Sequence, residues 1–227
     1  MKKILLLGAQ HGDEMLGDHL IKYIDTYRPE MLPYITYKIG NPRAYKHKVR
    51  FIESDLNRSY TGANATYEER LANEIIKFIS NKKFDLVLDL HTTTCDQPTI
   101  MIVASLNETV RQFSAISFIS NTIIMMPDIA DLGLIGNCPQ AISIEVYEDK
   151  IDNKLLAHIC DDIHRYVKKQ NIYQIENTLN KCEITKDRAL SLTNFKKSSY
   201  GFVPILVSES SYQKTNDFYG FKANKIS

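Results

Sequence analysis

Short apolar runs alternate with amphipathic stretches over the first three quarters of the chain. Runs of four to eight apolar residues are typical of buried strands, whereas apolar residues three and four positions apart are typical of helices that bury one face. Expected strands lie at residues 4–7, 34–39, 86–88, 99–104, 122–126 and 141–147. Expected helices lie at residues 16–27, 71–79, 108–118 and 155–166. This alternation predicts an α/β fold with a mostly parallel, mixed sheet and helices on both of its faces.

The pattern changes near residue 172. Short β-like runs follow at residues 181–185, 190–192 and 202–207, with no long amphipathic stretch between them. We therefore predict two domains, an α/β domain at residues 1–171 and a small β-rich C-terminal domain at residues 172–227.

Composition narrows the class of protein. The 28 basic and 27 acidic residues give a net charge of +1, so no overall field favours nucleic acid or a membrane surface. No apolar run approaches the ~20 residues that span a bilayer, and the first run is too short for a signal peptide. The four cysteines form no CxxC pair and are typical of reduced thiols. We expect a cytoplasmic protein without nucleic-acid or membrane partners.

Polar fragments follow three of the expected strands. His11 and Glu14 come after the first strand, His91 ends another, and Glu145 ends a third. Sites in open α/β sheets form at the carboxyl ends of strands, so these side chains are expected to meet. A His, a Glu and a His form the ligand set of a hydrolytic zinc that keeps one position open for water. We predict one zinc ion held by His11, Glu14 and His91.

Each fragment also has an ordinary interpretation. His11 with Glu14 is found at many helix starts, and single histidines are mostly structural. Asp89 is costly on a central strand unless it is paired, and support of a metal-bound histidine is one such role. Glu145, at the end of a buried strand, is either paired or functional, because burial raises a carboxylate pKa toward the range of a general base.

The segment at residues 41–64 has no clear period and many polar groups, which is typical of a functional loop. Arg50, Asn57 and Arg58 lie in it. A solvated basic loop is one interpretation, because several further basic residues are adjacent. The functional interpretation is that a neighbouring amide and guanidinium bind a carboxylate.

Five of these fragments occur in an order that resembles the aspartoacylase and succinylglutamate desuccinylase family. They are His11 to Glu14, Asn41 to Ala44, Arg50 to Arg58, Asp89 to Thr93 and Ile144 to Val146. The end of the chain is similar as well, since Glu209 is followed three residues later by Tyr212.

The resemblance implies a zinc-dependent deacylase with a carboxypeptidase-like α/β fold and a small β-rich C-terminal domain. With the domain boundary predicted above, the zinc hydrolase domain is expected to be residues 1–171. The implied roles are zinc binding by His11, Glu14 and His91, carbonyl polarisation by Arg50, carboxylate binding by Asn57 and Arg58, general-base catalysis by Glu145, and substrate contact by Tyr212.

Two departures from the family pattern bear on the substrate. Most family members continue Glu-Val with Gly-Pro, whereas this chain has Tyr147 and Glu148. Aspartoacylases carry a second carboxylate-binding arginine ten positions before the catalytic glutamate, and Ile135 stands there in this chain. We therefore expect no strong preference for N-acetylaspartate.

The leading hypothesis is a zinc amidohydrolase that cleaves the amide bond of a small N-acyl amino acid. One alternative is a zinc carboxypeptidase acting on a peptide C-terminus, whose carboxylate Asn57 and Arg58 would also suit. Another is a non-catalytic metal- or carboxylate-binding protein, which Glu145 and Arg50 argue against, because binding alone needs no general base. The acyl group, the amino acid and the formation of a homo-oligomer stay open at this point.

Overall fold

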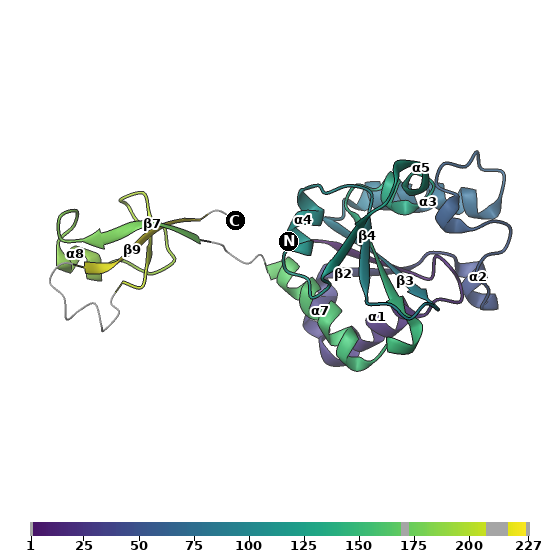
Figure 1. Cartoon of the computed structure of the whole chain (residues 1–227), viewed down its shortest axis with the longest axis horizontal. Coiled ribbons are helices and arrows are strands. Elements are labelled where there is room, and N and C mark those ends of the chain that lie inside the picture. The colour runs from purple at the N-terminus through teal and green to yellow at the C-terminus, as the bar shows by residue number, and fades with distance from the viewer. Residues whose placement is uncertain (1, 169–172, 208–217, 226–227) are drawn as a thin grey trace. The chain divides into compact units, whose positions relative to one another are not determined.

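The computed structural model describes residues 2–168, 173–207 and 218–225. The chain divides into two compact units, residues 1–168 and residues 169–227, and each is described by itself (Figure 1). None of the helices in these described parts combines the length and the apolar character that a bilayer crossing needs.

The first unit is built on a six-stranded sheet with the order β2-β1-β3-β6-β4-β5. The strands are β1 (Ile4–Gly8), β2 (Ile35–Ile39), β3 (Leu86–Thr93), β4 (Ile100–Val103), β5 (Asn121–Ile124) and β6 (Ala141–Tyr147). Neighbouring strands pair in parallel except at β4 and β6, which are antiparallel. The sheet is therefore mixed and mostly parallel, as the sequence predicts.

Helices cover both faces of this sheet (Figure 1). One face packs against α1 (Leu16–Tyr27), α4 (Glu108–Ser114) and α7 (Asn153–Lys168). The other face packs against α3 (Tyr67–Lys82), α5 (Pro127–Ala130) and α6 (Leu134–Asn137). The predicted fold class is confirmed.

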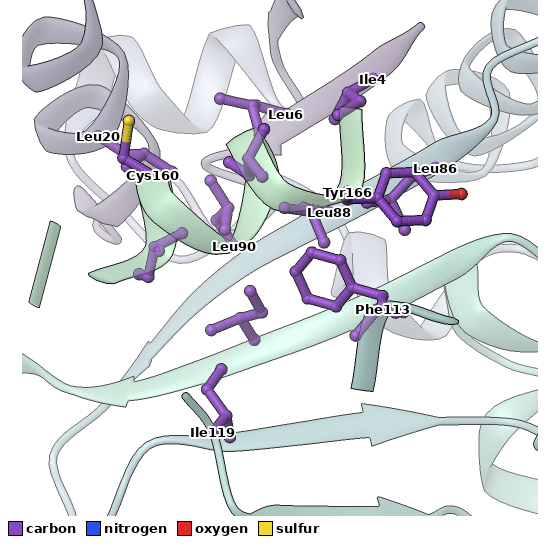
Figure 2. Packing of buried hydrophobic residues seen from close by; sticks show 14 of the residues in the cluster. Ile4, Leu6, Leu20, Leu86, Leu88, Leu90, Phe113, Ile119, Cys160 and Tyr166 are labelled. Atoms are coloured by element: carbon purple, nitrogen blue, oxygen red, sulfur yellow. The ribbon is translucent and has the colours of Figure 1, made fainter. Parts of the chain in front are cut away.

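The alternation of side chains along β3 decides which face carries chemistry. Leu86, Leu88 and Leu90 are fully buried in the core against α1 and α7, which Figure 2 shows at close range. Successive side chains of a strand point to opposite faces, so Asp89 and His91 point toward the side of α3, α5 and α6. The polar site therefore lies over that second face.

The segment between β2 and α3 is more ordered than the sequence suggests. It contains α2 (Pro42–His47) and a 3-10 helix, η2 (Leu56–Arg58). The Asn41 side chain accepts a hydrogen bond from the backbone nitrogen of Ala44, and Pro42 opens the helix, so α2 begins at a capped turn. Two further 3-10 helices, η1 (Pro29–Tyr34) and η3 (Glu148–Lys150), extend the ends of longer elements.

The second unit is a three-stranded antiparallel sheet with the order β7-β9-β8. Its elements are β7 (Tyr173–Asn180), α8 (Lys186–Leu190), β8 (Val203–Ile205) and β9 (Phe218–Lys225). The strands expected at residues 181–185 and 190–192 are wrong, because the first is a turn and the second lies at the end of α8. Only the strand expected at residues 202–207 contains an observed one.

Candidate functional site

Three buried side chains meet at the carboxyl ends of β1 and β3. His11, Glu14 and His91 are 4%, 7% and 2% exposed, and one ligand atom from each lies within 4.8 Å of the others. The carboxylate of Glu14 stands between the rings, with its Oε1 2.7 Å from Nδ1 of His11 and its Oε2 2.9 Å from Nδ1 of His91. The two rings thus turn the same nitrogen toward a common centre.

The other nitrogen of each ring contacts a carboxylate. Nε2 of His91 lies 2.9 Å from Oδ2 of Asp89, and Nε2 of His11 lies 2.9 Å from Oδ1 of Asp55. A neutral ring that donates from Nε2 leaves its Nδ1 lone pair free for a metal, and carboxylates of this kind orient metal-binding histidines. Two Nδ1 atoms and a carboxylate are donors that suit a divalent transition-metal ion, so these residues fit one.

Asp89 is itself held by a chain of buried hydrogen bonds. Nε2 of Gln10 donates to Oδ1 of Asp89 over 2.7 Å, and the Tyr60 hydroxyl donates to Oε1 of Gln10 over 2.7 Å. Burial raises the pKa of Tyr60 well above its usual value, so the phenol stays a donor. The orientation of His91 is thereby fixed through Asp89 from outside the cavity.

Charges within the cluster shift one another's pKa values. Burial alone would raise the pKa of Glu14, but His91 and His11 outweigh it and lower this pKa to about 2. Burial alone would lower the pKa values of both histidines, but Asp55 and Glu14 raise that of His11, and Asp89 and Glu14 raise that of His91 well above its usual value. Metal binding would therefore displace protons from the two rings.

Glu145 lies beside this cluster on β6. It is directly opposite His91 in the β3–β6 pairing, and its side chain is partly exposed. Burial raises its pKa, the charges of Glu14 and Asp89 add to the rise, and the histidines oppose it. A carboxylate with a raised pKa accepts and returns protons more readily near neutral pH.

The segment from Arg50 to Arg58 forms the rim of the site. Arg50 is half exposed, with Nη2 3.1 Å from Oδ2 of Asp55 and Nη1 3.9 Å from Oε1 of Glu14. Oδ1 of Asp55 also accepts a hydrogen bond from the backbone nitrogen of Asn57 over 2.9 Å. Asp55 therefore contacts His11, the Arg50 guanidinium and the backbone nitrogen of Asn57 at the same time.

The Glu68 carboxylate holds the first part of this rim, residues 52–54, through hydrogen bonds. Glu68, at the beginning of α3, accepts hydrogen bonds from the backbone nitrogens of residues 52, 53 and 54 over 2.8, 3.1 and 3.1 Å. Nδ2 of Asn41 donates to it as well, over 3.1 Å. The role of Glu68 was not predicted, because by position it is only an acidic residue in the first turn of a helix. Gln10 was missed too, although it directly precedes His11.

A cavity of about 410 Å³ connects these groups. Its lining includes every sequence-predicted site residue that the structure describes: His11, Glu14, Arg50, Asn57, Arg58, His91 and Glu145. Tyr212 lies outside the described residues. The lining also includes Ile135 of α6, noted above for its position ten residues before Glu145, and Ile102 of β4 and Ile129 of α5, which the sequence did not single out.

The sequence matches a known family of catalytic domains and several curated proteins. Residues 1–127 match the succinylglutamate desuccinylase/aspartoacylase catalytic domain. A probable aspartoacylase from Prochlorococcus marinus subsp. pastoris is 36% identical over 110 residues, which are 45% of this chain and 37% of that protein. The chain thus spans less than half the length of the curated relatives it matches.

Solved structures support the fold. The crystal structure of murine aminoacylase 3 superposes with a TM-score of 0.59 and 18% identity, over 99% of this chain and 95% of that one. A metallo-carboxypeptidase from Burkholderia cenocepacia gives a TM-score of 0.54 and 13% identity, over 74% of this chain and 56% of that one. At such identities the likeness concerns the fold, which is zinc-carboxypeptidase-like.

Proposed function

The chain belongs to the succinylglutamate desuccinylase/aspartoacylase family, and from this premise we propose that it is a zinc-dependent amidohydrolase that removes the acyl group of a small N-acyl amino acid. One observation carries the proposal. A His-Glu-His cluster, a carboxylate of raised pKa and two arginines line the same cavity. Metal binding alone would require neither Glu145 nor Arg50.

We propose zinc as the metal because two histidines and one glutamate are the protein ligands of many hydrolytic zinc sites. His11, Glu14 and His91 would hold it. A zinc ion in such a site lowers the pKa of water and polarises a carbonyl group. The remaining chemistry belongs to residues of the chain.

Arg58 and Asn57 would hold the α-carboxylate of the substrate, since a guanidinium and an amide together satisfy both carboxylate oxygens. Arg50 would donate hydrogen bonds to the carbonyl oxygen as negative charge develops on it. Glu145 would accept a proton from the attacking water and return it to the nitrogen as the C–N bond breaks. The products are a carboxylic acid and a free amino acid.

A zinc carboxypeptidase is the second candidate, because the fold resembles a metallo-carboxypeptidase and the same rim residues suit a peptide C-terminus. A hydrolysis screen of the zinc-loaded protein separates the two. N-acetyl amino acids and short peptides would be compared, with metal content measured in each preparation. We expect turnover of N-acetyl amino acids, and turnover of peptides alone would favour the carboxypeptidase.

A further inference from the structure

Part of the cavity lining consists of apolar side chains from residues 102–135. Ile102 lies in β4, Met125 follows β5, Ile129 lies in α5 and Ile135 lies in α6. We call these four residues the apolar wall. Ile129 is 39% exposed, and Ile102 and Met125 are partly exposed, so the wall presents apolar surface that a ligand can cover.

The apolar wall lies next to the proposed carboxylate anchor. A Cβ atom at Gly133, between Ile129 and Ile135, would lie 2.7 Å from Oδ1 of Asn57, so this backbone and the Asn57 amide are in close contact. The backbone nitrogen of Tyr60 also donates to the carbonyl oxygen of Leu132 over 3.1 Å. A group attached beside an anchored α-carboxylate therefore meets the wall.

Polarity falls steadily across the sheet toward the wall. In the strand register, Asp89 is opposite Ser143, and Ser143 is opposite Ile102. A carboxylate beside the metal ligands thus gives way to a hydroxyl and then to an alkyl side chain. On this face of the sheet, the end at Asp89 therefore suits a cation, whereas the end at Ile102 suits an apolar group.

The charge of the lining opposes a second carboxylate on the substrate. Five described lining residues are acidic, namely Asp13, Glu14, Asp89, Glu145 and Glu148. The arginines among the described lining residues are Arg50, which contacts Asp55, and Arg58, which donates to the carbonyl oxygen of Asn57. Among the residues that the structure describes, a side-chain carboxylate against the wall would find no free counter-ion to offset the loss of water.

On the basis of the proposed function, we propose that the substrates are N-acyl amino acids with an uncharged, apolar side chain, which the apolar wall receives. Asn57 and Arg58 hold the α-carboxylate, and the wall selects the group beside it. A single methylene in a hydrophobic pocket changes kcat/KM by about tenfold or more. The expected preference for an isobutyl over a carboxymethyl side chain is therefore at least about tenfold.

The test compares three side chains of nearly equal shape. N-acetylleucine, N-acetylasparagine and N-acetylaspartate would be offered to the zinc-loaded protein, and kcat/KM measured for each. We expect leucine to be preferred, asparagine to be intermediate and aspartate to be poorest. Turnover that favours aspartate over leucine would overturn this inference and leave the proposed function intact. Absence of turnover for every N-acyl amino acid would overturn the proposed function and the inference with it.

A charge placed on the wall makes the test specific to it. Ile129→Lys should raise kcat/KM for N-acetylaspartate relative to N-acetylleucine by about tenfold or more, because the lysine supplies the missing counter-ion. Leu132→Lys is the matched control, since Leu132 is 36% exposed in the same segment but is not among the described lining residues. The control should leave the ratio unchanged. Equal changes in both variants would overturn the assignment.

Binding without turnover gives an independent measure. Calorimetry on the Glu145→Gln protein would compare the Kd values of N-acetylleucine and N-acetylaspartate, with and without the Ile129→Lys change. Tighter binding of the leucine derivative, reversed in direction by the lysine, supports the inference. Tighter binding of the aspartate derivative before that change would overturn it.

Discussion

The two halves of the site are built in different ways. Asp89, His91 and Glu145 lie on the paired strands β3 and β6, where the register sets their spacing. Arg50 to Arg58 lie on a segment whose regular structure is one short 3-10 helix. The strand half is fixed by the sheet and by buried hydrogen bonds through Gln10 and Tyr60. The rim depends on contacts with a few side chains, mainly those of Asp55 and Glu68.

From this difference we expect the strand half to serve mainly metal binding and turnover, and the rim to serve mainly substrate recognition. Of the three proposed metal ligands, His91 lies on β3, whereas His11 and Glu14 lie in the turn between β1 and α1, and all three side chains are buried. Substrate recognition tolerates variation, and loops on a rigid scaffold are where such variation is usual. Substitutions in the strand half should therefore affect metal and turnover most, and substitutions in the rim should affect substrate binding most.

The largest effect is expected from His91→Ala in the strand half. Without one of three protein ligands, the protein should lose most of its zinc and with it measurable turnover. Metal analysis after dialysis against zinc-free buffer gives the occupancy. His19→Ala is the control, because His19 is exposed on α1 and should leave occupancy unchanged. Full occupancy in the His91 variant would remove that residue from the ligand set.

A smaller loss, confined to catalysis, is expected from Glu145→Gln. The amide keeps the shape but accepts no proton, so kcat should fall roughly 10²–10⁴-fold while zinc is retained. Glu148→Gln tests a second acidic residue that lines the same cavity and should change kcat only slightly. Similar losses in the two variants would point to a general charge effect and away from a proton transfer at Glu145.

The two carboxylates that support the histidines allow a direct comparison of the halves. Asp89→Asn and Asp55→Asn should each weaken zinc binding about 10–100-fold, measured by competition with a chelator. Only Asp55→Asn should also raise KM, because Asp55 contacts Arg50 and the backbone of Asn57. If both variants raised KM equally, the proposed division between the halves would be wrong.

The smallest effect is expected from Glu68→Gln, which alters the support of the rim. An amide has one acceptor oxygen, so part of the set of backbone hydrogen bonds to residues 52–54 is lost. We expect a several-fold rise in KM with little change in kcat, and a loss of about 1.5–3 kcal/mol in the free energy of unfolding. Glu74→Gln, exposed on the same helix, is the control.

Acid should reproduce the Glu68 effect in the unchanged protein. Hydrogen bonds to backbone nitrogens and to Asn41 outweigh burial and lower the pKa of Glu68 below its ordinary 4.5. The stabilisation it provides is therefore present above pH 4.5 and is lost as the pH falls through the lowered pKa. Chemical unfolding at a series of acidic pH values should show the difference between wild type and Glu68→Gln shrinking below pH 4.5.

The sheet and the meeting of polar residues were predictable because both rest on strong local patterns. β1 and the first three residues of β3 are continuous apolar runs, and β6 is mostly apolar before Glu145. His11 follows β1, and His91 and Glu145 lie near the carboxyl ends of β3 and β6. The ends of parallel strands share an edge, so sequence position was enough to bring these side chains together.

Other features depend on contacts that no local pattern reveals. α5 and α6 are only four residues each, so they are too short to show the repeating pattern of apolar residues that predicts a helix. Ile102, Met125 and Ile129 cannot be distinguished by sequence from ordinary core residues, and Ile135 is distinguished only by its position before Glu145, so the apolar wall appears only once the fold is known. Glu68 acts through backbone groups, whose positions are set by the loop itself. The strands β7 and β9 also lie outside the ranges in which strands were expected for the C-terminal domain.

The apolar wall comes from one contiguous stretch, residues 102–135, between the last proposed metal ligand and the proposed general base. In genetic terms, the proposed selectivity of the apolar wall and the proposed metal ligands are therefore encoded in separate parts of the gene. Exchange of a single internal block of codons can alter what the cavity accepts while every codon for the metal ligands and for Glu145 is preserved. Such a block is a suitable unit for recombination, and for variant libraries that are screened for activity on other N-acyl amino acids.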